Sequence, residues 1–197
     1  MIKIYLDCEM TGLTKNDRLI SIGAIYNDPI SRKNKTFYAE FNDYDKNRLS
    51  DWIKENVIKN LKFNDKESMK LESMHDVKIK SNSEYISEEF RKWIEKIKDD
   101  VIFVADVGHY DIVFTYELFG GAFSLPKNLS ATYHDLNTDI ANHLQISEIE
   151  SFDICREDLV LEEITDVEKH NALYDAIVCK YISDRLEKSK MMLSTGF

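Results

Sequence analysis

The chain opens with residues 2–13, IKIYLDCEMTGL, a stretch that turns from apolar to acidic within a few residues. Its first part, residues 2–7, is rich in β-branched and aromatic side chains and predicts a buried strand. Side chains alternate along a strand, so Asp7 and Glu9 face the same side if the strand includes both. They stand at its carboxyl end, where α/β sheets place their functional sites.

The composition indicates one globular domain. Of the 197 residues, 43% are hydrophobic and 31% are charged, and the 6 Gly and 2 Pro leave little material for linkers. The cysteines Cys8, Cys155 and Cys179 have no metal-type spacing, which predicts free thiols in a reducing, cytoplasmic environment. No run reaches the roughly 20 apolar residues of a membrane span, so we expect no membrane partner.

The formal net charge of −10 bears on the class of function. A protein that coats nucleic acid without sequence preference is usually basic, so the charge disfavours a passive coating role. It does not exclude an enzyme that holds only a chain end, particularly if bound cations offset clustered carboxylates.

The order of expected elements predicts an α/β domain with a mixed sheet flanked by helices. Strands are expected at 2–7, 19–27, 35–41 and 101–105, the last fully apolar and therefore central and parallel. Helices are expected at 46–60, 85–98, 111–119, 135–144 and from about 171 to 186, with Trp52 and Trp93 in the core. The Lys-rich stretch 59–80 predicts a long irregular excursion, either a solvated surface or a face for nucleic acid.

The acid pair by itself is weak evidence for a site. At about 4 Å and an effective dielectric near 20, two carboxylates repel by roughly 4 kcal/mol. Solvation, protonation of one acid or a bridging cation would each relieve that repulsion. Later segments add Asp111, after the apolar strand and near a helix start, and Asp175, in the first turns of the last helix. Helix capping alone would also explain Asp111.

These residues together resemble a known family. The stretch from Asp7 to Leu13 resembles the first motif of DEDDh-superfamily 3′–5′ exonucleases, especially that of oligoribonuclease. Asp111 resembles the aspartate of the second motif, and His170, with Asp175 five positions later, resembles the third motif. The segments 19–23, 37–40, 52–61 and 107–111 are similar to the compact exoribonuclease AS family. Val107 departs from the common pattern, which has an Asn at that position.

The resemblance implies a ribonuclease-H-like fold for residues 1–188 and a 3′–5′ exoribonuclease that releases 5′-mononucleotides from the 3′ ends of single-stranded RNA. Residues 189–197, at the end of the chain, are expected to form a flexible tail. The resemblance also implies two Mg²⁺ or Mn²⁺ ions held by Asp7, Glu9, Asp111 and Asp175, because such hard cations favour oxygen ligands. It implies His170 as the general base. A homodimer is implied by the compact family alone.

The substrate would lie against two short segments. The turn of Met10, Thr11, Gly12 and Leu13 is expected to meet the terminal nucleotide, with Leu13 either as a wedge against the last base or as core packing. His109 and Tyr110 flank Asp111 and are candidates for contact with a phosphate or a base.

Three other readings stay open. A single-stranded DNA exonuclease or proofreading subunit would carry the same motifs, since discrimination rests on the 2′-hydroxyl. A non-catalytic module on the same fold is disfavoured by the intact set of motif residues. A zinc or nucleophile enzyme lacks both metal-type His and Cys spacing and a nucleophile elbow.

Overall fold

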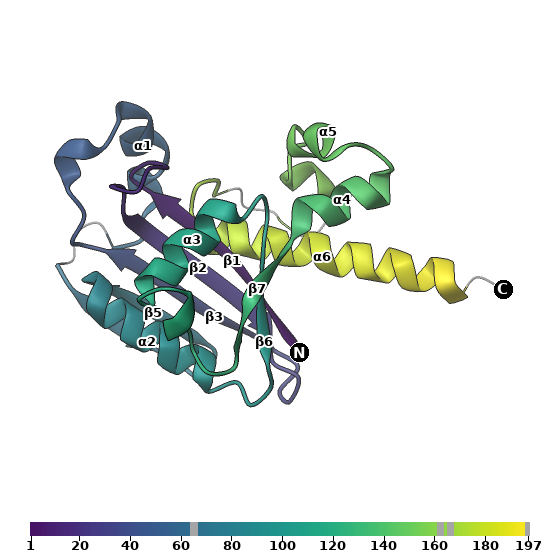
Figure 1. Ribbon diagram of the computed structural model, residues 1–197, viewed down its shortest axis with the longest axis horizontal. Coiled ribbons are helices and arrows are strands. Elements are labelled where there is room, and N and C mark those ends of the chain that lie inside the picture. The colour runs from purple at the N-terminus through teal and green to yellow at the C-terminus, as the bar shows by residue number, and fades with distance from the viewer. Residues whose placement is uncertain (64–66, 161–163, 165–167, 196–197) are drawn as a thin grey trace.

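The computed structural model describes residues 1–63, 67–160, 164 and 168–195. These residues form a seven-stranded sheet in the order β4-β5-β3-β2-β1-β6-β7, with helices on both faces (Figure 1). The strands are β1 (Ile2–Met10), β2 (Leu19–Asn27), β3 (Asn34–Phe41), β4 (Met69–Glu72), β5 (Asp76–Ser81), β6 (Val101–Ala105) and β7 (Leu129–Asp135). The expected mixed α/β sheet is confirmed.

The sheet combines an antiparallel meander with parallel additions. β1, β2 and β3 pair antiparallel, as the short connections between them require, and β6 pairs parallel with β1 and β7. The α-helices are α1 (Asp51–Asn56), α2 (Ser83–Glu95), α3 (His109–Leu118), α4 (Leu136–Leu144), α5 (Glu148–Phe152) and α6 (Ala172–Thr195). None of the helices in the described ranges is long and apolar enough to cross a membrane.

The alternation along β1 divides the core between the two faces of the sheet. Ile4, Leu6 and Cys8 pack into the cluster that includes residues of α2 and α3. Tyr5 belongs to the cluster formed with α6 and α4, and Figure 1 shows α6 crossing that face. Since Asp7 and Glu9 share the parity of Tyr5, they lie on the α6 face. Strand geometry therefore points both acids toward the beginning of α6.

A glycine lets α6 approach the sheet. Gly23 of β2 is the antiparallel partner of Asp7. A Cβ at Gly23 would lie 2.3 Å from the backbone carbonyl of Ala172, the first residue of α6. Only glycine permits this contact, which places the residues around Ala172 directly beside Asp7.

Several expectations require correction. The expected helix at 46–60 is broken into η1 (Lys46–Arg48), α1 and η2 (Ile58–Asn60), because Leu49 is extended and Ser50 caps a new helix through its bond from Ile53 N–H. The Lys-rich stretch is not wholly irregular, since it contains β4 and β5; its residues 64–66 lie outside the described residues.

Further differences concern Trp52 and the C-terminal region. Trp93 is buried as expected, but the side chain of Trp52 is 55% exposed, because Ile53 and Val57 face the core from that helix instead. The strand β7 and the helix α5 have no counterpart among the expected elements. α6 continues to Thr195, so residues expected in a tail from Ser189 are helical that far, and the flexibility of residues 189–195 stays a prediction. Residues 196–197 lie outside the described residues.

Candidate active site

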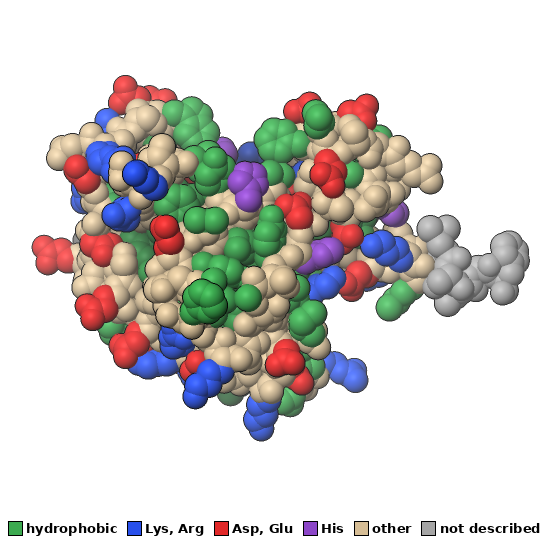
Figure 2. Space-filling model, in the orientation of Figure 1, with side chains coloured by type: hydrophobic (Ala, Val, Ile, Leu, Met, Phe, Trp, Pro, Cys, Tyr) green, Lys and Arg blue, Asp and Glu red, His purple; other side chains and the backbone are tan. Residues whose placement is uncertain are grey.

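The site lies in a hollow of the molecular surface. Figure 2 shows the surface indented between the lobe that carries α1 and the lobe that carries α4 and α5. A cavity of about 300 Å³ is lined by Asp7, His170 and Asp175 together with residues that follow α5. Segments far apart in the sequence thus meet at the carboxyl end of β1.

Asp111 is bonded to β1 just beyond the last residue pair of the β1–β6 ladder. The ladder between β1 and β6 ends at the pair Tyr5 and Val104. Beyond it, Asp111 Oδ1 accepts a 2.8 Å hydrogen bond from the backbone N–H of Cys8. Asp111 lies in the first turn of α3, as the sequence predicts, and its side chain is buried. Its carboxylate is therefore anchored between the two acids of the first motif.

His170 and Asp175 are tied together at the start of α6. The backbone N–H of His170 donates to Asp175 Oδ2 at 2.9 Å. His170 has φ +62°, in the left-handed region that a residue with a side chain seldom adopts. The backbone N–H of Asp175 in turn donates to the carbonyl of Asn171. This turn directs the imidazole and the carboxylate to the same side.

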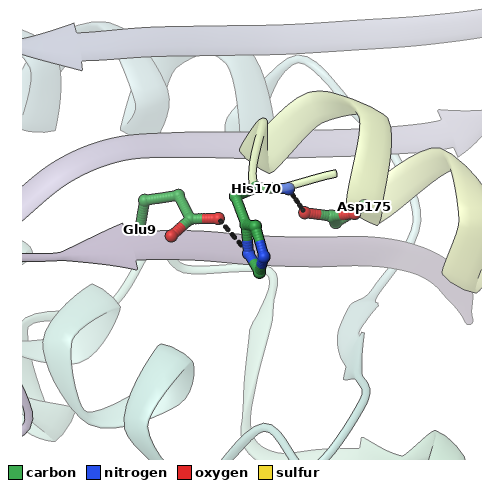
Figure 3. A group of neighbouring side chains, drawn as sticks. All are labelled: Glu9, His170 and Asp175. Carbon is green, nitrogen blue, oxygen red and sulfur yellow. Dashed lines mark hydrogen bonds and ion pairs between the residues drawn. The ribbon is translucent and has the colours of Figure 1, made fainter. Parts of the chain in front are cut away.

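The structure brings three of the predicted residues into one cluster. Ligand atoms of Glu9, His170 and Asp175 all lie within 4.8 Å of one another. Figure 3 shows Glu9 extending from β1 toward the imidazole, whose Nδ1 is 3.9 Å from Glu9 Oε1. The edge of the Trp52 ring lies against the same imidazole, with ring centroids 5.0 Å apart. The first and third motifs thus meet as the sequence predicts.

Burial of clustered acids raises their pKa values. Burial, followed by the charges of Asp175 and Asp111, raises the pKa of Glu9 to about 8 and that of Asp7 well above its usual range. Burial also raises the pKa of Asp175 to about 7, although the bond from His170 opposes the shift. The pKa of Asp111 rises to about 6 for the same reason, opposed by the bond from Cys8. The two basic side chains that line the cavity, Arg156 and Lys169, pair with other acids, Asp106 and Glu157.

The donor set fits divalent cations. Asp7 Oδ2 is buried and has no hydrogen-bond partner among the residues that the structure describes, an arrangement that costs free energy unless a proton or a cation is bound. Glu9 and Asp175 of the cluster, with the nearby carboxylates of Asp7 and Asp111, supply the oxygen ligands that Mg²⁺ and Mn²⁺ favour. The imidazole of His170 is the only nitrogen ligand in the cluster that the described residues form.

The expected substrate turn is held from inside by a residue that the sequence analysis did not single out. Asp17 is buried, and its carboxylate accepts hydrogen bonds from Thr11 Oγ1, Thr14 N and Thr14 Oγ1. Arg48 of η1 forms an ion pair with it at 3.0 Å. Leu13 is 55% exposed at the tip of this turn, so it is not core packing, and its contact with a base stays a prediction.

The remaining expected contact residues lie at or near the surface. Met10 is half-buried at the end of β1, and the hydroxyl of Thr11 is used inside the turn. The rings of His109 and Tyr110 are exposed and lie with centroids 4.6 Å apart at the start of α3. Their roles toward a substrate are untested.

Further charged residues line the site, among them Asp106 and Arg156. Asp106 directly follows β6 and forms an ion pair with Arg156, whose Nε lies 2.5 Å from Asp106 Oδ2. Asp106 directly follows an apolar strand, which is the same sequence feature that identified Asp7 as a candidate. Arg156 had no such signal, because it lies in an irregular segment whose place is set only by tertiary packing.

Comparisons with known proteins agree with this geometry. The sequence matches the family described as the 3′-5′ exoribonuclease Rv2179c-like domain over residues 2–186, nearly the whole chain. No curated protein matches the sequence.

Solved structures with the same fold include several nucleases. The nuclease domain of 3′hExo, a DEDDh family member bound to rAMP, is 12% identical with a TM-score of 0.65, over 95% of this chain and 92% of that one. A 3′-exonuclease described in the recognition of a histone mRNA stem-loop is 12% identical with a TM-score of 0.65, over 95% and 82% of the two chains. Cell-death related nuclease 4 is 14% identical with a TM-score of 0.63, over 95% and 64%. The ribonuclease-H-like fold expected from the motifs is confirmed.

Proposed function

We propose that this chain, which belongs to the family of 3′-5′ exoribonuclease Rv2179c-like domains and is a DEDDh-type 3′–5′ exonuclease, acts on the 3′ ends of single-stranded RNA and releases 5′-mononucleotides. The observation that carries the proposal is the cluster of Glu9, His170 and Asp175. Asp7 lines the adjoining cavity, and Asp111 is bonded to the strand between Asp7 and Glu9. The exoribonuclease description of the family supports RNA as the substrate. The same geometry would serve DNA, so the substrate is decided by experiment.

Asp7, Glu9, Asp111 and Asp175 would hold two Mg²⁺ or Mn²⁺ ions. When bound, such ions supply positive charge for the attacking and leaving oxygens of a phosphodiester. The buried oxygen of Asp7 without a partner supports its role as a metal ligand. The raised pKa values of the four acids indicate that a metal would displace protons from this cluster.

His170 would act as the general base on the attacking water. Burial, with the nearby charge of Lys169, lowers the pKa of its imidazole, so the neutral form that accepts a proton predominates at neutral pH. Its side chain is 41% exposed and can reach a water in the hollow. The substrate's last nucleotide would lie between this imidazole and the turn at Gly12 and Leu13.

A time course on 5′-labelled oligomers tests the proposal. Single-stranded RNA with Mn²⁺ or Mg²⁺ should shorten from its 3′ end and yield 5′-mononucleotides, whereas a matched DNA oligomer should be degraded more slowly and EDTA should stop the reaction. Asp7→Ala should be inert, and His170→Ala should lose about 10²–10⁴ in kcat. Faster degradation of DNA would overturn the substrate assignment, and an active Asp7→Ala variant would overturn the metal site.

A further inference from the structure

The loop that carries His170 depends on contacts from outside itself. His170 lies in the left-handed region, a conformation that costs on the order of 1 kcal/mol or more and persists only when surrounding structure enforces it. Its own hydrogen bond to Asp175 fixes one end of the loop. Glu9, Tyr38 and Glu157 also contact the loop. The densest set of contacts comes from a segment more than a hundred residues earlier, Trp52 to Lys62, here called the α1–η2 segment.

Asn60 forms the central contact between the two segments. Its Nδ2 donates at 2.7 Å to the carbonyl oxygen of Lys169, the residue before His170. Its own carbonyl accepts a 3.0 Å bond from Asn171 Nδ2, on the residue after His170. The same Nδ2 also donates to the carbonyl of Asn56 within the α1–η2 segment. Asn60 therefore contacts both neighbours of the histidine, the backbone of Lys169 through its side chain and the side chain of Asn171 through its backbone carbonyl.

Two further contacts join the α1–η2 segment to the His170 loop. The Trp52 ring meets the imidazole of His170 edge-on at 5.0 Å, and Lys62 forms an ion pair with Glu168 at 2.6 Å. Residues 168 to 171 are thus contacted in succession by the same short segment. The ion pair is exposed and contributes little, so the bonds of Asn60 dominate.

The α1–η2 segment is itself fixed to the sheet. Its apolar side chains pack in a cluster with Ile20 of β2. The fully buried Glu40 of β3 accepts the backbone N–H groups of Lys62 and Phe63 at 2.5 and 3.0 Å. Because the segment is anchored on β2 and β3, it can impose a position on the loop it contacts.

We propose that Asn60 is a positioning residue that sets the orientation of His170 through the Lys169 carbonyl and the Asn171 side chain. This inference rests on the proposed function, in which His170 acts on the attacking water. A misplacement of about 1 Å can cost roughly 10²-fold in rate, so loss of the side-chain bond from Asn60 to the Lys169 carbonyl should lower kcat with little change in KM.

Asn60→Asp is the sharpest variant, because it keeps the shape of the side chain and replaces both donated bonds by repulsion from two carbonyl oxygens. We expect a fall in kcat of about 10- to 100-fold on single-stranded RNA with Mn²⁺. Asn60→Ala is the second variant, should the aspartate impair folding. Asn56→Ala is the matched control, because within the described part of the chain its side chain bonds to Trp52 O of the same helix and not to the His170 loop.

A double-mutant cycle with His170→Ala separates positioning from a general structural role. If Asn60 acts through His170, Asn60→Ala should reduce kcat in the parent and add no further loss in His170→Ala. Equal losses in both backgrounds, or an effect confined to KM, would overturn the inference. Full activity of His170→Ala would instead contradict the proposed base.

A spectroscopic measurement tests the contact without any turnover. The chain has two tryptophans, so Trp52 fluorescence can be read alone in a Trp93→Phe background. His170→Ala in that background gives the signal of a lost ring contact. Asn60→Asp should shift the spectrum toward that signal, whereas Asn56→Ala should not. An unchanged spectrum in Asn60→Asp would overturn the positioning role even if the protein proved inactive on every substrate.

Discussion

Gly23 of β2 lies directly against the backbone of Ala172 at the start of α6, so close that a Cβ on Gly23 would be 2.3 Å from the Ala172 carbonyl. Gly23 is also the cross-strand partner of Asp7. One missing side chain therefore allows the third motif to reach the first. The contact couples the packing of a helix to the geometry of the site.

Gly23→Ala should therefore damage both stability and activity. The obstructing atoms are backbone, which cannot rotate away, and overpacking of this kind costs about 1–3 kcal/mol in the free energy of unfolding. Because α6 must shift, activity should fall by more than the loss of folded protein explains. Urea unfolding and steady-state kinetics on folded protein measure the two effects.

Ser21→Ala is the matched control for this prediction. Ser21 is buried on the same strand, and its hydroxyl has no hydrogen-bond partner in the described ranges, so its removal should cost little stability. A Gly23→Ala protein as stable and active as Ser21→Ala would show that the approach of α6 does not require glycine.

Local patterns in the sequence were enough to predict the strands β1, β2, β3 and β6 and the ends that carry the acids. Apolar alternation and turn residues are encoded within each segment, so Asp7 and Asp111 could be placed on their elements in advance. Trp52 could not be placed, because helical spacing does not tell which side of a short, broken helix faces the sheet. Its exposure depends on where the His170 loop lies.

The elements and residues that the sequence did not predict also depend on tertiary contacts. β4 and β5 pair at the sheet edge with Lys side chains along them, and a strand at an edge needs few apolar residues. β7 carries polar residues such as Ser130 and His134, for which pairing with β6 supplies the stabilisation. Arg156 reaches the site through a loop whose course is set by packing. Such features depend on contacts between distant segments, which a single sequence does not display.

Asp7→Asn should make the metal-free protein more stable while abolishing activity. The carboxylate of Asp7 is buried among other acids, and the amide removes one negative charge and can donate to a neighbouring carboxylate. Relief of such functional strain commonly adds about 0.5–2 kcal/mol to the free energy of unfolding. Thermal unfolding in EDTA measures the gain, and addition of Mn²⁺ should stabilise the parent far more than the variant. A less stable variant would indicate that the Asp7 charge is compensated within the protein.

Stability of the metal-free protein should fall as pH rises. The pKa values of Asp111, Asp175 and Glu9, about 6, 7 and 8, lie above the ordinary carboxylate range near 4. The folded protein therefore binds more protons than the unfolded chain between about pH 4 and 8, and its stability declines through that window. Mn²⁺ competes with these protons, so the rise in Tm that it causes should be larger at about pH 8.5 than at about pH 5.5. Equal rises at the two pH values would contradict the link between metal and acids.

Asp17→Asn should weaken substrate binding by loosening the turn from Met10 to Leu13. The Asp17 carboxylate accepts two hydrogen bonds from Thr14, which follows the turn, and one from Thr11 within it, and it pairs with Arg48. These bonds outweigh the opposing effect of burial and hold its pKa below the usual range. Hydrogen bonds to a charged group are worth about 1.5–3 kcal/mol each, so loss of one should raise KM about tenfold or more. Steady-state kinetics on a short RNA oligomer would measure the change.

Asp28→Asn provides the comparison for Asp17, because Asp28 plays a similar part in the turn between β2 and β3. Its carboxylate accepts from Ile30 N at 3.0 Å and Ser31 Oγ at 2.8 Å, and these bonds lower its pKa to about 2. The turn from Met10 to Leu13 precedes β2, whereas the Asp28 turn follows it, at the other end of the strand. The Asp28→Asn variant should therefore lose stability and keep its KM. If Asp17→Asn lowered stability but left KM at the value of Asp28→Asn, the turn would not contact the nucleotide, and recognition of the RNA end would have to be assigned to His109, Tyr110 or the α1–η2 segment.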